Sequence, residues 1–248
     1  MDEAAWDRIA PDFDEWVLDV AANDRQGLIS NCLQRLRGKD RIAADIGCGV
    51  GRGLDMIAEH FGKVYATDIS RNCLAIAERD LARFHNIRYI HADLSVEHGL
   101  PEPVDVAVCT NTLLIASLQK REAMFHHLCQ CVKPGGHLLL VVPALESALY
   151  VSYRMVRNNR YSGMPPKAAL SKARREMSAL EHGIVLIDGV PTKHHLKEEL
   201  HDLLEAERML VIATDKIEYP WSFVMEEPPE GMSGYCPWNW MVVAQRVA

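Results

Sequence analysis

Short apolar runs alternate with amphipathic segments from Arg41 to Pro143, and this alternation constrains the fold of the 248-residue chain more than any other feature. The apolar runs have the length and bounding residues of β-strands. They occupy residues 41–46, 63–67, 87–91, 104–109 and 136–142. Apolar residues at helical spacing predict helices in three intervening segments, residues 52–61, 70–84 and 117–131. Repeated strand–helix–strand order predicts an α/β fold, doubly wound around a mostly parallel sheet.

The segments before and after this alternation complete a single predicted domain, residues 1–248. We expect N-terminal helices in residues 1–38, a core in 41–143, an insert with two helices in 144–190, and a helix and strand pair in 191–248. The last helix covers residues 195–207 and is followed by a strand at 210–217, a Pro/Gly-rich loop at 226–237 and a final strand at 238–247. Because a loop rather than a helix joins the last two strands, they should pair antiparallel. The prediction is a seven-stranded sheet whose last strand is antiparallel, with helical lid elements.

Composition excludes several classes of protein. The longest apolar run, Leu138–Leu145, is far shorter than the ~20 residues of a membrane span. The acidic N-terminus lacks a basic-then-apolar signal pattern, so we expect a cytoplasmic protein without a membrane partner. Seven scattered cysteines without a Cys-x-x-Cys pair favour reduced thiols. His126, His127, Cys129 and Cys131 fall on a predicted helix, where positions two apart face different ways, so we predict no metal site.

The first apolar run leads into the loop ADIGCGVGRG, residues 44–53, with glycines at 47, 49, 51 and 53. A dinucleotide fingerprint, G-x-G-x-x-G, needs a third glycine where this chain has Arg52, counted from Gly47, or Leu54, counted from Gly49. Asp45, two residues before the first glycine, would repel a pyrophosphate but can pair with an ammonium group. The loop therefore opposes a nicotinamide dinucleotide.

With these residues the chain resembles the class I S-adenosylmethionine-dependent methyltransferases. The resemblance is carried by Asp45-Ile-Gly-Cys-Gly-Val-Gly51 and by Asp68 and Asp93, which follow the second and third strands. VDVAVCTN at 104–111 and the strand after Lys-Pro-Gly-Gly at 133–136 match as well. The core match covers roughly residues 41–143 and implies S-adenosylmethionine as the cofactor.

The resemblance also implies roles for residues at the ends of the strands. The glycines would let the backbone pass the methionine part of the cofactor, Asp45 would lie near its amino group, Asp68 would bind the ribose hydroxyls and Asp93 the adenine amino group. The residues so implied to contact the cofactor are Asp45, Gly47, Cys48, Gly49, Gly51, Asp68, Ile69, Asp93, Leu94, Thr110 and Asn111.

Methyl transfer requires mainly that the acceptor atom be aligned ~3 Å from the methyl group and that water be excluded. A general base can assist, and the candidates are His194, His195 and Tyr153, with Tyr161 as a further tyrosine in the insert. The fourth strand ends in Cys-Thr-Asn-Thr, which lacks the Asn/Asp-Pro-Pro-aromatic and Pro-Cys motifs of enzymes that methylate nucleic-acid bases. RNA and protein acceptors stay open.

The acceptor is best predicted as a small molecule. Trp6, Phe13 and Trp16 give the N-terminal segment an apolar face, and the 144–190 insert supplies a second wall. Net charge is −7, which disfavours nucleic acid, yet residues 150–175 hold seven Lys/Arg and no acid, leaving −14 for the remainder. This basic run is either a solvated lid surface or a site that favours an anionic acceptor.

Four other readings stay open. They are an aminopropyl transferase on the same cofactor fold, a nicotinamide oxidoreductase, a methyltransferase acting on protein or RNA, and a non-catalytic methyltransferase-like subunit. The acceptor atom and the oligomeric state are not predicted.

Overall fold

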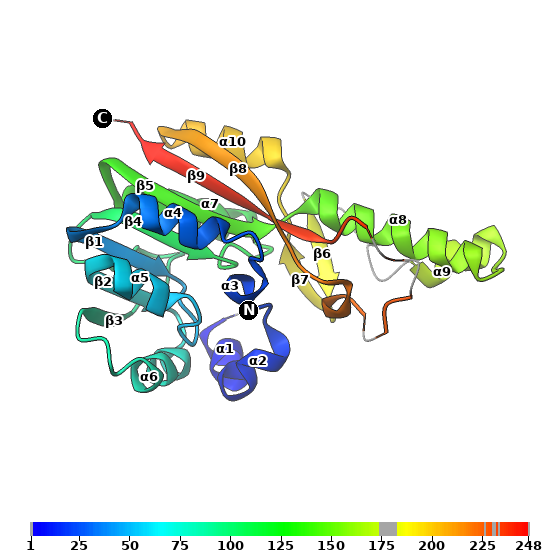
Figure 1. Ribbon diagram of the computed structural model, residues 1–248, viewed down its shortest axis with the longest axis horizontal. Coiled ribbons are helices and arrows are strands. Elements are labelled where there is room, and N and C mark those ends of the chain that lie inside the picture. Colours follow the sequence, from blue (N-terminus) through cyan, green and yellow to red (C-terminus); the bar gives the residue numbers. More distant parts are fainter. Residues whose placement is uncertain (1, 174–182, 226, 230–231, 233, 248) are drawn as a thin grey trace.

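The computed structural model describes residues 2–173, 183–225, 227–229, 232 and 234–247, and its main body is a sheet between two layers of helices (Figure 1). The sheet has seven strands in the order β3-β2-β1-β4-β5-β9-β8. Their bounds are β1 Gly38–Ile46, β2 Phe61–Asp68, β3 Ile87–His91, β4 Val104–Thr110, β5 Val132–Pro143, β8 Met209–Glu218 and β9 Trp238–Arg246. The first five pair in parallel, and β9 pairs antiparallel with both β5 and β8. The predicted fold class and the antiparallel last strand are confirmed.

Apolar side chains on both faces of the central strands explain the two helical layers. Leu138 and Leu140 of β5 belong to one core cluster, whereas Leu139 and Val141 belong to the other. Helices α7 (Leu118–Gln130) and α10 (Lys197–Ala206) cover the first face. Helices α4 (Leu28–Leu36), α5 (Leu54–His60) and α6 (Arg71–Asp80) cover the second. Burial on both faces is what a parallel sheet with helical crossovers requires.

The N-terminal segment forms four short helical pieces: α1 (Glu3–Ile9), η1 (Ala10–Asp12), α2 (Phe13–Trp16) and α3 (Val20–Asn23). The predicted helical character of residues 1–38 is confirmed, although β1 already begins at Gly38. Helix α6 begins as expected, because the Ser70 side chain accepts a hydrogen bond from the backbone N–H of Cys73.

The insert after β5 contains helices α8 (Leu145–Tyr161) and α9 (Pro166–Ala173), as predicted, and a hairpin that was not predicted. Strands β6 (Ile184–Ile187) and β7 (Val190–Lys193) pair as a separate two-stranded sheet. Asp188 and Gly189 form its turn with φ angles of 48° and 78°. An Asp-Gly pair between apolar runs is a local sequence signal for such a hairpin. Residues 174–182 of the insert, with Arg174 and Arg175, lie outside the described residues.

One further difference concerns the start of β5. The Lys-Pro-Gly-Gly stretch lies within β5 rather than before it, and the pairing with β4 skips from Val132 to His137 across it. Gly135 there has a φ of 78°, as the third residue of a type II turn needs.

Among the described residues, no helix is both long and apolar enough to cross a membrane.

Candidate functional site

The glycine loop follows β1 at the carboxyl edge of the sheet and is closely packed. Gly47, Gly49 and Gly51 have φ angles of 74°, 54° and 85°. A Cβ on Gly47 would lie 2.2 Å from the Thr112 hydroxyl oxygen, and one on Gly49 would lie 2.7 Å from the Phe13 ring. Because an added Cβ would clash and the left-handed backbone disfavours side chains, only glycine fits these positions.

Asp68, at the end of β2, joins the glycine loop to the following helix. Its Oδ2 accepts a hydrogen bond of 2.8 Å from the backbone N–H of Gly49, and its Oδ1 accepts one of 2.8 Å from that of Ser70. Burial raises the pKa of the Asp68 carboxyl, whereas the backbone N–H donors lower it. Each carboxylate oxygen has a second lone pair, so Asp68 can still accept from a diol.

Asp45, at the end of β1, is a buried carboxyl without a hydrogen-bond donor. Asp45 is only 6% exposed, and no described residue donates a hydrogen bond to its carboxylate. Burial, and secondarily the charge of Asp68, raise the pKa of Asp45 to about 7. A buried carboxylate without a partner is costly, and a cationic ligand group would offset that cost. The site therefore fits a ligand that carries an ammonium group.

The remaining residues implied for the cofactor lie along the same edge. The Asp93 Oδ1 accepts a 2.8 Å hydrogen bond from the Ser95 N–H, and Leu94, next in the chain, is buried. The Ile69 carbonyl accepts a 2.9 Å hydrogen bond from the ring of His91. Cys48 is buried, and burial raises the pKa of its thiol well above the ordinary value. A thiol in that state is a small packing group rather than a nucleophile.

Thr110 and Asn111, at the end of β4, lie beside the end of β1. The Thr112 hydroxyl donates to the Ile46 carbonyl over 3.1 Å, which ties the two strand ends together. Asn111 has a φ of 50°, and its Oδ1 accepts a 3.3 Å hydrogen bond from the amide of Asn239 on β9. Such strained backbone persists where neighbouring structure holds it, and it concentrates at functional sites. Sequence reasoning missed Asn239, because 128 residues separate the two amides.

The N-terminal helices cover this edge through polar and aromatic contacts. The Asp7 carboxylate accepts hydrogen bonds from the Ser70 hydroxyl, at 2.6 Å, and from the Asn72 N–H, at 3.1 Å. Arg52 of the glycine loop pairs with Asp14 and lies 5.0 Å from the centre of the Phe13 ring. The Phe13 ring thus lies against the loop, whereas Trp16, predicted on the same apolar face, is 63% exposed.

A buried charged network holds the loop that follows β4. Four consecutive carbonyls in this loop, those of residues 113–116, each accept a hydrogen bond from it. His195 Nε2 lies 3.2 Å from the first carbonyl, and the backbone N–H of Lys193 donates to the second over 2.8 Å. Arg121 Nη1 donates to the third and fourth carbonyls over 2.9 and 3.0 Å. Lys193, only 1% exposed, also pairs with Glu199 at 2.6 Å. The network fixes the loop beside the end of β4.

The three predicted general bases lie in different environments. His195 is fully buried, which lowers its pKa to about 3. His194 is also buried, which lowers its pKa, and its Nδ1 lies 3.2 Å from the Thr192 carbonyl. Tyr153 is exposed on α8, with its hydroxyl 3.4 Å from Arg157 Nη1. The geometry of His195 favours positioning of the loop, and the base role of all three stays a prediction.

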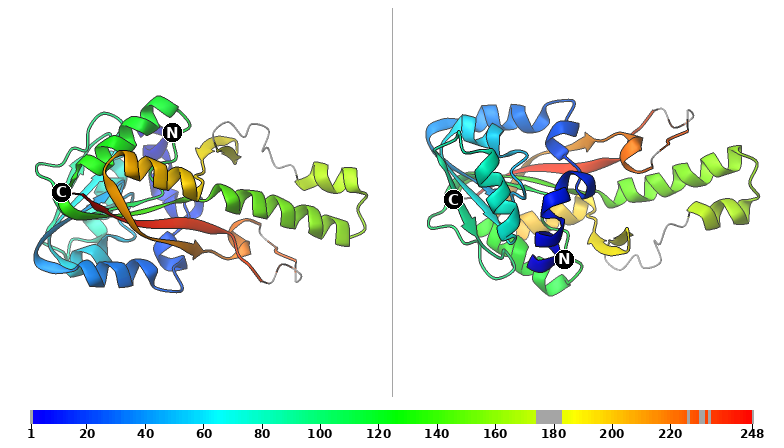
Figure 2. Two further views of the ribbon diagram at one scale, coloured as in Figure 1. Left: turned by 90° about the horizontal axis from the view of Figure 1, so that it is seen from above. Right: turned by 90° about the horizontal axis from the view of Figure 1, so that it is seen from below.

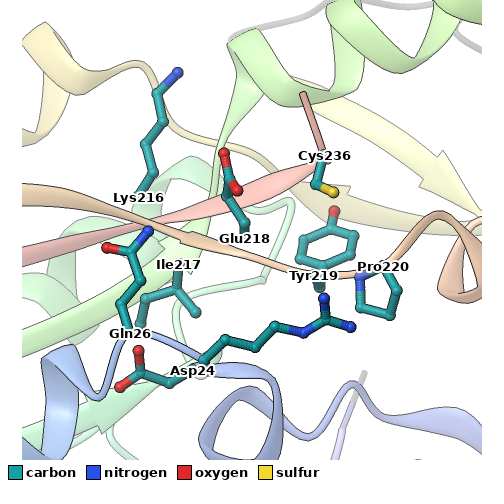
Figure 3. A pocket seen from close by; sticks show the side chains of 9 residues that line it. Asp24, Gln26, Lys216, Ile217, Glu218, Tyr219, Pro220 and Cys236 are labelled. Atoms are coloured by element: carbon teal, nitrogen blue, oxygen red, sulfur yellow. The ribbon is translucent and has the colours of Figure 1, made fainter. Parts of the chain in front are cut away.

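A cavity of about 60 Å³ lies elsewhere, between the end of α3 and β8 (Figure 3). Its lining includes Asp24, Gln26, Glu218, Tyr219 and Cys236. A space of this size holds at most a few water molecules. It is therefore too small for a nucleoside and separate from the glycine loop.

Comparison with known proteins bears directly on this edge of the sheet. Residues 43–136 match the family described as "Methyltransferase domain". This match, together with the fold, supports a class I S-adenosylmethionine-dependent methyltransferase. The cofactor of this family is S-adenosylmethionine. The matched region contains the glycine loop, Asp68, Asp93 and the end of β4.

Two curated relatives match part of this chain. It is 29% identical over 119 residues to phosphoethanolamine N-methyltransferase 1 of Arabidopsis thaliana, covering 44% of this chain and 24% of that protein. It is 31% identical over 104 residues to phosphoethanolamine N-methyltransferase 2 of Caenorhabditis elegans, covering 40% and 23%. The chain thus spans about a quarter of the length of these relatives.

Solved structures share the whole fold at low identity. The N-methyltransferase NodS from Bradyrhizobium japonicum, in complex with S-adenosylhomocysteine, superposes with a TM-score of 0.63 at 14% identity, covering 98% of this chain and 97% of that chain. Magnesium protoporphyrin IX methyltransferase from Synechocystis, with bound S-adenosylmethionine, superposes with a TM-score of 0.59 at 17% identity, covering 99% and 97%. At such identities the likeness shows the fold of this chain alone.

Proposed function

We propose that this chain binds S-adenosylmethionine at the glycine loop and transfers its methyl group to a small-molecule acceptor. The observation that carries the proposal is Asp45, a buried carboxyl without a donor, at the position where the resemblance to the family implies the cofactor's ammonium group. When bound, the cofactor supplies a methyl group activated by a sulfonium. The protein then has to hold, align and desolvate the reactants.

Each neighbouring group has a role in that task. Asp45 pairs with the ammonium group, and Asp68 accepts hydrogen bonds from the ribose hydroxyls while its two backbone donors keep it in place. Asp93 and the Leu94 amide bind the adenine edge. Phe13 covers the glycine loop and excludes water from it.

The acceptor is held beside the end of β4, where the paired amides of Asn111 and Asn239 offer hydrogen-bond groups. Beneath the neighbouring loop, Arg121 and Lys193 are both buried cations, and Glu199 is the carboxylate paired with Lys193. The two cations outnumber the one carboxylate, and this excess of positive charge favours an acceptor with negative charge. Phosphoethanolamine, the acceptor named for the curated relatives, has such a charge and is the first compound to test.

The test is thermal unfolding with S-adenosylmethionine, S-adenosylhomocysteine and NAD in parallel, followed by transfer of a labelled methyl group. A ligand at a hundredfold excess over its dissociation constant adds ~2.7 kcal/mol, a shift of several degrees for a domain of this size. We expect shifts with the adenosyl sulfur compounds only, full in the wild type and in Asp202→Asn, an exposed control, and no more than about half as large in Asp45→Asn.

The second stage uses phosphoethanolamine and a panel of small amines and carboxylates with and without phosphate. Labelled product with a small acceptor supports the proposal. Binding of S-adenosylmethionine without transfer to any of them would contradict catalysis on small molecules. A shift with NAD alone would contradict the assignment of the glycine loop.

A further inference from the structure

The hairpin formed by α8 and α9, residues 145–173, projects from the body of the protein (Figures 1 and 2). The first part of α8 is packed on the core side, where the Tyr150 ring lies 6.1 Å from the rings of both Trp221 and Trp238. At ~1.5 Å per residue, the 17 residues of α8 extend ~25 Å. Its far end and α9 therefore lie well away from the glycine loop.

This hairpin differs in charge from the rest of the chain. From Ser147 to Ala173 the sequence has no Asp or Glu, against an acidic remainder. Its cations are Arg154, Arg157, Arg160, Lys167 and Lys172. The Arg157 guanidinium is held by the Tyr161 hydroxyl, at 2.9 and 3.1 Å, and by that of Tyr153, at 3.4 Å. These contacts are neutral, so the positive charge of Arg157 stays available to an anionic surface.

Exposed apolar side chains accompany the cations. Tyr161 is 75% exposed and Leu170 is 51% exposed, although both are large. Nearer the body of the protein, the loop after β8 lies against the first part of α8 and exposes Phe223 and Tyr235. A polyanion such as RNA would use the charges and the aromatic rings but not the leucine. An anionic bilayer accommodates all of them, since its headgroups attract Lys and Arg and its interface takes up Tyr, Phe and Leu.

We propose that the α8–α9 hairpin docks this protein onto an anionic lipid bilayer. The contact is peripheral, because the helices of the described residues are too short or too polar to cross a membrane. The sequence-based expectation of no membrane partner rested on the absence of a spanning run, and the proposed docking departs from it. Docking is independent of cofactor binding and of the proposed methyl transfer.

The test is co-sedimentation of the full chain with vesicles of phosphatidylcholine alone or with 30% phosphatidylglycerol, at low and high salt. Each Lys or Arg near an anionic surface contributes about five-fold in partitioning, so Arg157→Glu/Arg160→Glu should reduce binding at least 25-fold. The matched control is Arg35→Glu/Arg37→Glu, which makes the same charge change at exposed positions around the end of α4. Tyr161→Ser/Leu170→Ser, which leaves the charge unaltered, should reduce binding about ten-fold.

We expect the wild type and the Arg35/Arg37 control to bind the anionic vesicles only, and less at high salt. Equal losses in both double charge reversals would overturn the proposal, because binding would then follow net charge. Unchanged binding after Tyr161→Ser/Leu170→Ser would overturn the apolar part. Absence of vesicle binding, together with a mobility shift of single-stranded RNA, would assign the hairpin to nucleic acid instead. Unaltered melting temperatures show that the exposed variants are folded.

Discussion

Asp45→Asn should stabilise the ligand-free protein while it removes tight binding of S-adenosylhomocysteine. The reason is the pKa of the Asp45 carboxyl, which burial and the nearby Asp68 raise from 3.8 to about 7. This interval corresponds to a penalty of about 4 kcal/mol for an ionised, unpartnered Asp45 in the folded state. Asparagine has nearly the same shape and no charge, so the penalty is absent in the variant.

The sign follows from which state holds the proton. Below pH ~4 the folded and unfolded wild type are both protonated at Asp45. As pH rises from ~4 to ~7, only the unfolded state releases the proton, so the wild type loses stability relative to the variant by ~1.4 kcal/mol per pH unit. Above pH ~7 both states are ionised and the difference stays constant.

Urea unfolding of both proteins at pH 5 and pH 8 measures this difference. The advantage of Asp45→Asn should grow by about 3 kcal/mol between the two, and any pH-independent effect of the amide cancels. Calorimetry should also show that wild-type affinity for S-adenosylhomocysteine falls about ten-fold per pH unit below ~7, and that the variant binds at least ten-fold more weakly at pH 8. An advantage that does not change with pH, or equal ligand affinity in both proteins, would refute the reasoning.

Three further variants test other parts of the site. Gly47→Ala should destabilise the protein by ~2–4 kcal/mol in chemical unfolding, since its Cβ would lie 2.2 Å from a threonine hydroxyl at a φ of 74°. Gly53→Ala, in the same loop with open space around its Cβ, should change stability by less than ~1 kcal/mol. Arg121→Ala should cost ~1.5–3 kcal/mol in the same assay, because the half-buried carbonyls of Ile115 and Ala116 lose a charged donor. A loss smaller than ~1 kcal/mol would contradict the network. Phe13→Ala should raise the dissociation rate of S-adenosylhomocysteine about ten-fold in stopped-flow measurements, whereas Trp16→Ala, exposed in the same segment, should leave it unchanged.

Much of the core could be predicted because its signals are local. The alternation of apolar runs and amphipathic segments follows from the periods of strand and helix, and Ser70 caps α6 through a residue only three positions away. The positions of Asp45 and Asp68 at strand ends follow in the same way, because parallel strands bring their carboxyl ends to one edge. The hairpin at Asp188-Gly189 was not predicted, although its Asp-Gly turn is also a local signal.

By itself, then, the sequence determined the order of strands and helices, the glycine loop and the acids that follow the strands. Only the tertiary structure decided that Asp7 reaches Ser70 across 63 residues, that Asn239 meets Asn111, and that Arg157 stays exposed while Lys193 is buried. The physical reason is that periodicity and capping depend on neighbours within one or two turns. Burial, pKa and pairing depend on groups that only the packing of distant segments brings together.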